Sequence, residues 1–210
     1  MRKQIRYIAM CMAVIFSLAG CGSNTTGGSD MGDSHYNVSN EDNKTELETA
    51  TYTIEGIDFK MILVEAGTFT MGSDNTNVAF SESPAHKVTL TQNYLMGETE
   101  VTEALWNAVM SNGGGNTQPK TSVTWDEAHT FVDRLTEIAR EQGLITGNMR
   151  FRLPTEAQWE FAAKGGNQSK GYLYSGSNDI NEVAVTYENS GSSSPLDVKT
   201  KAPTAAPRPE

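Results

Sequence analysis

Cysteine is scarce in this 210-residue chain, and its placement is uneven. The two cysteines, Cys11 and Cys21, both lie within the first 21 residues. Beyond Cys21, no residue can form a disulfide, join a cysteine metal cluster or act as a thiol nucleophile. A long apolar run is lacking as well, since Tyr7–Leu18 covers about a dozen residues and a membrane-spanning helix needs roughly 20. These absences exclude a disulfide-stapled fold and argue against a retained membrane span.

Basic residues are also in deficit. Lysine and arginine total 16 against 26 aspartates and glutamates, which gives a net charge of −10. Arg2, Lys3 and Arg6 precede the apolar run, so the rest of the chain carries −13. Because like charges repel, we expect no nucleic-acid partner. With 37% hydrophobic and 20% charged residues, the composition fits one folded domain and excludes collagen, coiled coil and full-length disorder.

Residues 1–20 have the organisation of an export signal: a positive end, an apolar run and small residues. The run ends in Leu18-Ala19-Gly20-Cys21, which resembles the lipobox of bacterial lipoproteins. The resemblance implies that the chain is cut before Cys21 and that Cys21 carries the lipid, palmitate among its acyl chains. The protein would then be anchored to a bacterial membrane, on its periplasmic or cell-surface side. The alternative is an ordinary secretory leader with an incidental cysteine.

Composition divides the remainder of the chain. Residues 21–50 are rich in Gly, Ser, Thr, Asn and acidic residues, and we predict a disordered tether there. We place the folded domain at residues 51–200. Residues 201–210 contain three prolines without periodicity, and we expect a disordered tail.

Strand-like patterns open the predicted domain. Met61–Val64 and Thr68–Met71 flank Glu65-Ala66-Gly67, which predicts a hairpin. Alternating apolar residues over His86–Met96 predict one half-buried strand. The polar residues 73–84 between them predict a loop.

Three helices follow, and each begins after a threonine. Thr102 precedes the first, while Thr124 and Thr155 each open a capping box. Gly143 and Gly165-Gly166 are the expected ends of the second and third helices. Strands followed by helices and glycine-rich loops predict an α+β domain.

Five motifs occur in a fixed order along roughly 105 residues. They are Phe69-Thr70-Met71-Gly72, Glu82-Ser83-Pro84-Ala85-His86-Lys87-Val88, Glu100-Val101-Thr102, Val123-Thr124-Trp125-Asp126-Glu127-Ala128 and Arg152-Leu153-Pro154-Thr155-Glu156-Ala157-Gln158-Trp159-Glu160-Phe161-Ala162-Ala163. This order resembles the formylglycine-generating enzyme family, also called the sulfatase-modifying factor family. The resemblance implies a variant of the C-type lectin fold. It also implies an oxidation in which a cysteine pair holds copper and a sulfatase cysteine becomes formylglycine; complete members carry calcium as well.

The family cysteines belong to the second half of the family domain, and this sequence does not contain that half. Lys199–Pro203 resembles the stretch ahead of the family's Asn-Gly-Leu-Tyr-Asp-Met run, but Thr204–Glu210 does not continue it. We therefore expect a domain that is incomplete at the C-terminus, through a broken reading frame or as a natural short form. Because copper chemistry of this kind needs thiolates, we assign no catalytic, metal-binding or cofactor-binding residue and expect no cofactor in this chain.

Two sets of polar residues have a functional and a structural interpretation. Glu82 and His86 could supply an acid and a ligand around Pro84, and Glu156 and Glu160 lie one helical turn apart near Arg152. We interpret both sets as structural.

The sequence also contains oxygen donors that could bind calcium and tryptophans that could lie in the core. Oxygens that could bind calcium occur at Asn178, Asp179, Asn181, Glu182 and Asn189, but the family's ligand pattern does not map onto them. We predict Trp125 and Trp159 as core aromatics, and Trp106 with less support.

The sequence therefore predicts a lipid-anchored extracytoplasmic protein whose partial domain is catalytically inactive by itself. One alternative is a full-length enzyme with a broken reading frame, whose intact form generates formylglycine. The other is a lectin-like surface module or envelope scaffold that binds protein or glycan.

Overall fold

The computed structural model describes residues 15–17, 49–74, 82–191 and 194–201. The expected lipidation site at Cys21, most of the expected tether and nearly all of the expected tail lie outside these residues. Strands and helices are mixed, so the α+β prediction is confirmed. Within the described residues, none of the helices is both long and apolar enough to span a bilayer.

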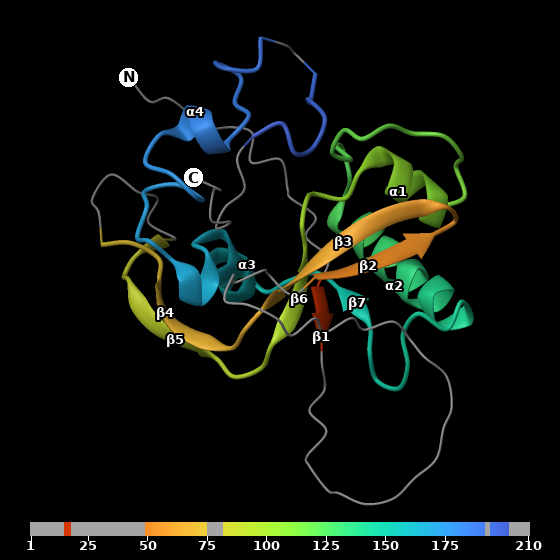
Figure 1. Cartoon of the computed structure of the whole chain (residues 1–210), viewed down its shortest axis with the longest axis horizontal. Helices are drawn as coiled ribbons and strands as arrows, with labels where there is room; N and C mark the ends of the chain where they lie inside the picture. The colour runs from red at the N-terminus through yellow and green to blue at the C-terminus, as the bar shows by residue number, and fades with distance from the viewer. Residues whose placement is uncertain (1–14, 18–48, 75–81, 192–193, 202–210) are drawn as a thin grey trace, which may run out of the picture.

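The strands form a five-stranded and a two-stranded antiparallel sheet. The larger sheet has the order β2 (Thr49–Ile54), β3 (Ile57–Val64), β6 (Tyr94–Gly97), β1 (Ile15–Ser17), β7 (Phe151–Arg152). The smaller sheet pairs β4 (Gly67–Met71) with β5 (His86–Leu90). Figure 1 shows β6 between a region built from β2, β3, α1 and α2 and a region built from β4, β5 and α3.

The predicted hairpin at residues 61–71 is wrong. β3 pairs with β2 and β6, whereas β4 pairs with β5. The predicted single strand at 86–96 is likewise divided into β5 and β6, which lie in different sheets. Val64 pairs with Tyr94 and Gly67 with Leu90, so the two segments run side by side and bend together from one sheet into the other. The residues that resembled a turn form this bend.

Polar side chains and a glycine fix the bend. Asn93 Oδ1 accepts a 2.8 Å hydrogen bond from the Ala66 N–H, and Asn167 Nδ2 donates one of 3.0 Å to the Ala66 carbonyl. A Cβ on Gly67 would lie 2.7 Å from the Phe161 ring, so a larger residue would push α3 away from this position. The bend is therefore determined by contacts from two distant segments.

The three predicted helices are confirmed as α1 (Glu103–Val109), α2 (Trp125–Glu141) and α3 (Glu156–Ala163). Thr102, Thr124 and Thr155 each accept a hydrogen bond from the backbone N–H three residues later, and both capping boxes form completely. A fourth helix, α4 (Ile180–Val183), is a single turn within the loops after α3. Caps of this kind act locally, which is why the sequence alone predicts where these helices begin.

The core lies mainly between α1, α2 and the β2–β3 end of the large sheet. Its buried residues are Ile54, Met61, Val101, Leu105, Trp106, Val109, Ala128, Phe131, Val132, Leu135, Ala139, Ile145 and Phe151. Trp106 stacks on Phe131 with a centroid separation of 4.9 Å. A second, smaller cluster holds Tyr94 and Met96, against which Val64, Leu90 and Ala162 pack.

Candidate functional site

The first turn of α3 joins two strands of the large sheet, and we call Tyr94, Arg152 and Gln158 the α3 junction. The Tyr94 hydroxyl donates a 2.7 Å hydrogen bond to the Gln158 carbonyl, and Arg152 Nη1 donates one of 3.1 Å to Gln158 Oε1. Arg152 also donates to the Leu153 carbonyl at 3.0 Å. One glutamine thus connects β6 with β7 although the two strands are not neighbours in the sheet.

Electrostatics keep the α3 junction in one protonation state. Burial raises the pKa of the Tyr94 phenol far above its ordinary value, and the nearby Arg152 charge offsets only part of this rise. Burial lowers the pKa of Arg152, and repulsion from Arg150 lowers it further. A guanidinium starts from a pKa far above neutral, so Arg152 keeps its charge at neutral pH despite this lowering. Tyr94 keeps its proton because its pKa is raised.

Three residues of the predicted leader lie between the strands joined by this junction. Ile15, Phe16 and Ser17 pair with Met96, Leu95 and Tyr94 of β6, and Ile15 and Phe16 also pair with Arg152 and Phe151 of β7. Both pairings are antiparallel. The sequence indicated an apolar segment here, but not its place inside the sheet of the domain.

Glu160 has a structural role, as expected, but its partners differ from the expected one. Its Oε1 accepts a 3.0 Å hydrogen bond from the Gly72 N–H and forms a 2.6 Å ion pair with Lys164. Lys164 in turn donates to the Thr70 carbonyl at 2.9 Å. The carboxylate therefore fastens α3 to β4, whereas Arg152 binds the amide of Gln158.

Glu82, Pro84 and His86 lie in a segment whose contacts are mainly backbone contacts. The Glu82 carbonyl accepts from the Ser73 N–H at 2.8 Å, and the His86 ring Nδ1 lies 3.0 Å from the Pro84 carbonyl. Both side chains are exposed. These contacts position the start of β5.

The prediction that Trp125 and Trp159 are core residues is wrong. Trp125 is 60% exposed and Trp159 is 41% exposed. Trp125 is the first residue of α2, where it lies against His129, and α3 buries Phe161 in place of Trp159. Trp106 is buried at 5% exposure.

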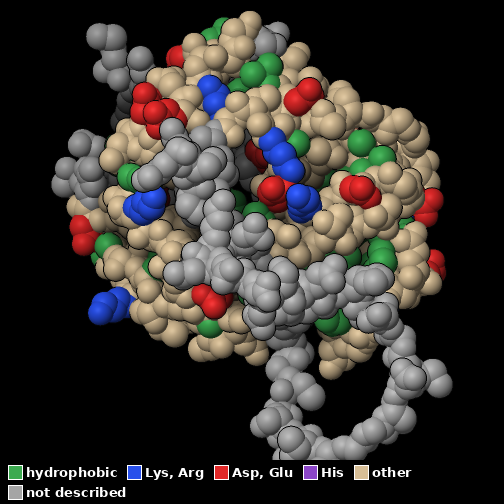
Figure 2. Space-filling model, in the orientation of Figure 1, with side chains coloured by type: hydrophobic (Ala, Val, Ile, Leu, Met, Phe, Trp, Pro, Cys, Tyr) green, Lys and Arg blue, Asp and Glu red, His purple; other side chains and the backbone are tan. Residues whose placement is uncertain are grey.

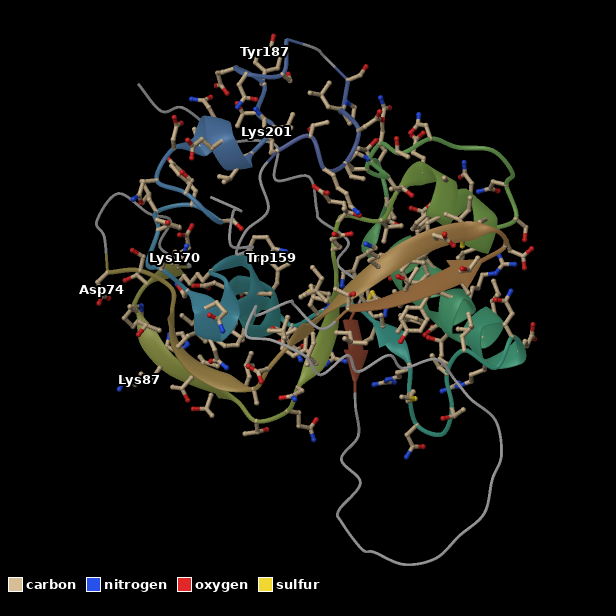
Figure 3. All side chains as sticks on the ribbon, in the orientation of Figure 1. Asp74, Lys87, Trp159, Lys170, Tyr187 and Lys201 are labelled. Carbon is tan, nitrogen blue, oxygen red and sulfur yellow. The ribbon has the colours of Figure 1, made fainter. Side chains whose placement is uncertain are left out.

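Trp159 belongs to a set of exposed apolar side chains on α3 and the segment after it, which we call the exposed aromatic set. Its other members are Tyr172, Leu173, Tyr174 and Tyr187. Figure 3 shows Trp159 projecting from α3 on the side where the later segment lies, with Tyr187 at the outer edge of that segment. Figure 2 shows acidic and basic side chains interspersed on this face, with hydrophobic areas small and separate.

Hydrogen bonds hold the loop that carries this set. The Leu173 N–H donates to Asn178 Oδ1 at 2.9 Å, and the Tyr174 N–H donates to the Ser177 carbonyl at 3.0 Å. Loops carry binding residues in many proteins, and tyrosine and tryptophan are frequent among the residues that dominate binding. The exposure of these side chains does not follow from the sequence, because it depends on what packs above the loop.

The oxygen-rich residues after α3 serve as internal hydrogen-bond partners. Asp179 Oδ1 accepts from the Asn181 N–H at 2.9 Å, and Asn189 Nδ2 donates to Asn181 Oδ1 at 3.1 Å. Glu182 Oε2 accepts from the Ser177 hydroxyl at 2.6 Å. These contacts cap α4 and close its loop.

The donor set of this chain does not fit copper. Among the residues that the structure describes, no three His, Cys, Asp or Glu side chains come together as a possible metal site. The sequence supplies no thiolate after Cys21, and thiolates are the soft ligands that such copper chemistry uses.

Comparison with known proteins identifies the class to which this fold and motif order belong. The sequence model of the sulfatase-modifying factor enzyme 1-like domain matches residues 48–208. The chain therefore belongs to the family of sulfatase-modifying factors and formylglycine-generating enzymes. This confirms the resemblance carried by the five motifs.

One curated protein and two solved structures are similar to this chain. A curated protein of Paenibacillus barcinonensis, named Chaperone protein LppX, is 31% identical over 160 residues, which cover 62% of this chain and 54% of that protein. The chain thus spans about half the length of this curated relative. Treponema denticola variable protein 1 superposes with a TM-score of 0.60 at 28% identity over 74% of this chain and 70% of its own. PvdO from Pseudomonas aeruginosa shares the fold, with a TM-score of 0.55 at 22% identity over 70% of this chain and 64% of its own.

Proposed function

We propose that this chain is a lipid-anchored, extracytoplasmic binding protein that engages exported polypeptides and does not itself generate formylglycine. The observation that carries the proposal is the placement of cysteine. Cys21 ends a run that resembles a lipobox, and no cysteine follows it. One cysteine thus serves anchoring, and none remains to hold copper for the oxidation.

Two further observations support a polypeptide as the partner. The exposed aromatic set lies on α3 and on the segments before and after α4, and its members Leu173 and Tyr187 are 74% and 80% exposed. Aromatic side chains supply large contact areas at little entropic cost, which is why they are frequent in protein-binding surfaces. The Paenibacillus relative is named a chaperone protein, which is the kind of activity that an anchored polypeptide-binding module would have.

Metabolic labelling with palmitate tests the anchor. We expect the wild-type chain to incorporate the label and to fractionate with membranes. Cys21→Ser abolishes incorporation, because the acylated thiol is gone. The matched control is Cys11→Ser, which removes the other leader cysteine and leaves labelling unchanged. Equal labelling of the wild type and Cys21→Ser would contradict the anchor.

The second experiment tests whether the protein binds unfolded polypeptides, here called clients, and keeps them from aggregating. The mature protein, purified in detergent micelles, is mixed with reduced, denatured lysozyme, and light scattering reports aggregation. We expect the wild type to suppress aggregation, and the triple variant Trp159→Ser, Tyr172→Ser, Leu173→Ser to suppress it at least fivefold less. The matched control is Trp125→Ser, an exposed tryptophan on α2, which retains the wild-type effect.

Two outcomes would contradict this function. The first is absence of protection by the wild-type protein. The second is aldehyde formation in a sulfatase-derived cysteine peptide incubated with the purified chain and copper, which would make the chain an enzyme. Binding to a glycan array without any protection would favour the lectin-like alternative.

A further inference from the structure

The large sheet contains a strand that the proposed maturation removes. β1 (Ile15–Ser17) lies between β6 and β7, and all three of its residues precede Cys21. A chain cut before Cys21 has no β1. The place between β6 and β7, which we call the β6–β7 slot, is then no longer occupied by residues 15–17.

The walls of the β6–β7 slot are held by contacts that do not involve β1. β6 is paired with β3 over four residue pairs, and the Tyr94 hydroxyl fastens it to α3. On the other side, the Thr136 hydroxyl of α2 accepts a 3.0 Å hydrogen bond from the Phe151 N–H. Arg152 connects β7 with α3 through Gln158. Each wall is thus attached to the rest of the domain by contacts that do not depend on β1.

Backbone geometry defines what fits. Adjacent strands lie about 4.8 Å apart, so walls that flank one strand are about 9.6 Å apart and admit one extended segment. Successive residues of a strand direct their N–H and C=O groups to opposite edges. Since Phe151 uses Thr136 of α2, the N–H and C=O of Arg152 face the slot, where Ile15 pairs with it. An entering segment therefore needs free N–H groups and cannot carry proline at the position of Ile15.

Neighbouring side chains define the polarity of the segment. One strand position pairs with both Leu95 and Phe151, and cross-strand partners share a face of the sheet. Phe151 is 1% exposed and belongs to the large core, against which Leu95 packs. The central position of the slot thus continues an apolar core and favours an apolar residue.

We propose that the β6–β7 slot is a strand-accepting binding site for an extended apolar segment of an exported polypeptide, antiparallel to both walls. In the precursor, residues 15–17 occupy the site; removal of the leader opens it. This inference rests on the proposed function and adds to the exposed aromatic set a second site, which binds one stretch of the bound polypeptide as an extended strand. The segment gains main-chain hydrogen bonds on both edges, a mode of recognition that selects for apolar pattern more than for sequence.

Disulfide trapping tests the inference. The protein is the mature lipoprotein with Leu95→Cys, and the probe is a dye-labelled synthetic peptide of residues 13–19 with Phe16→Cys. Antiparallel partners have Cα atoms about 4.5–5.5 Å apart, within the range that a disulfide bridges. The matched control is Leu63→Cys, because Leu63 pairs with Leu95 from β3 and lies one strand farther from the slot. At about 9.6 Å its thiol is out of reach.

We expect Leu95→Cys to trap the peptide at least tenfold faster than Leu63→Cys does. The peptide of natural sequence competes with trapping, and the same peptide with Ile15→Pro does not. A second arm uses the uncut precursor, made with Cys21→Ser and Cys11→Ser alongside Leu95→Cys, its retained leader verified by mass. There we expect trapping to fall at least tenfold, because residues 15–17 fill the slot.

Equal trapping at positions 95 and 63, equal trapping in precursor and mature chains, or no trapping at all would overturn the inference. The proposed function is judged separately by palmitate labelling and client protection. If protection persists without trapping, clients bind elsewhere on the molecule and only the slot is wrong. If protection is absent while trapping is specific, the slot exists and the chaperone-like function is wrong.

Discussion

The two regions on either side of β6 are held together in different ways. The region of α1, α2, β2 and β3 encloses the large core, in which Phe131, Leu135 and Ala139 are fully buried. The region of α3, β4 and β5 has a much smaller cluster around Tyr94 and Met96. It is joined instead by single polar contacts, such as Glu160 to Gly72 and Asn167 to Ala66.

The two regions therefore depend on different interactions: one on burial of apolar surface, the other on individual hydrogen bonds. Burial of apolar surface is additive and not directional, so the large core tolerates conservative changes that keep its volume. A hydrogen bond from a particular side chain to a particular backbone group is directional. The α3 region therefore depends on a few polar residues, and it is also the region that carries the exposed aromatic set and one end of the β6–β7 slot.

A substitution in the large core should cause the largest loss in the free energy of unfolding. Phe131→Ala removes a fully buried ring that stacks on Trp106, and we expect the free energy of unfolding to fall by about 3–5 kcal/mol in urea titrations. The matched change in the α3 region, Phe69→Ala, removes a half-buried ring that contacts Phe161 at a centroid separation of 5.1 Å. We expect it to cost about 1–2 kcal/mol. Equal costs would break the comparison.

A smaller effect is expected at the contact between α3 and β4. Glu160→Gln keeps an acceptor oxygen but loses the charge that binds the Gly72 N–H and Lys164, and we expect a loss of about 1 kcal/mol. Glu156→Gln, at an exposed position one turn earlier on the same helix, is the control and should cost less than about 0.5 kcal/mol. A loss at Glu160 no larger than the loss at Glu156 would contradict the contact with β4 as the source of the effect.

The smallest effect is expected at the start of α2 and depends on pH. Hydrogen bonds from the Thr124 N–H and hydroxyl, each of 2.7 Å, lower the pKa of Glu127 below its ordinary value of 4.5. Because the folded pKa is the lower one, the ionised carboxylate stabilises the fold fully above pH 4.5, and this contribution is lost as the pH falls through the lowered pKa. Urea midpoints of the wild type and Glu127→Gln should differ at pH 7 and converge on acidification. A gap that stays constant down to pH 2.5 would contradict the assignment.

The sequence predicted local features well and strand partners poorly. Helix starts at Thr102, Thr124 and Thr155 follow from side chains within three residues of the backbone groups they bind. The apparent turn at 65–67 is a bend because a distant segment, residues 86–97, runs alongside it. No property of residues 61–71 alone distinguishes a hairpin turn from a bend between two sheets.

The features of the candidate site likewise divide into those that the sequence predicts and those that depend on packing. Motif order gave the family, and cysteine placement gave the argument against oxidation by this chain. Which aromatic residues are exposed could not be read from the sequence, because Trp125 and Trp159 resemble core residues until the packing of α2 and α3 is known. The partners of Glu160 were missed since Gly72 is 88 residues away.

By itself, the sequence determined the family, the charge, the helices and the candidate lipid attachment at Cys21, because these depend on residue types and on short spacings. Only the tertiary structure decided that Gln158 connects β6 with β7 and that a strand from residues 15–17 lies between them. Pairing of strands depends on backbone groups that every residue carries, so the chain sequence leaves the choice of partner open until the core is packed.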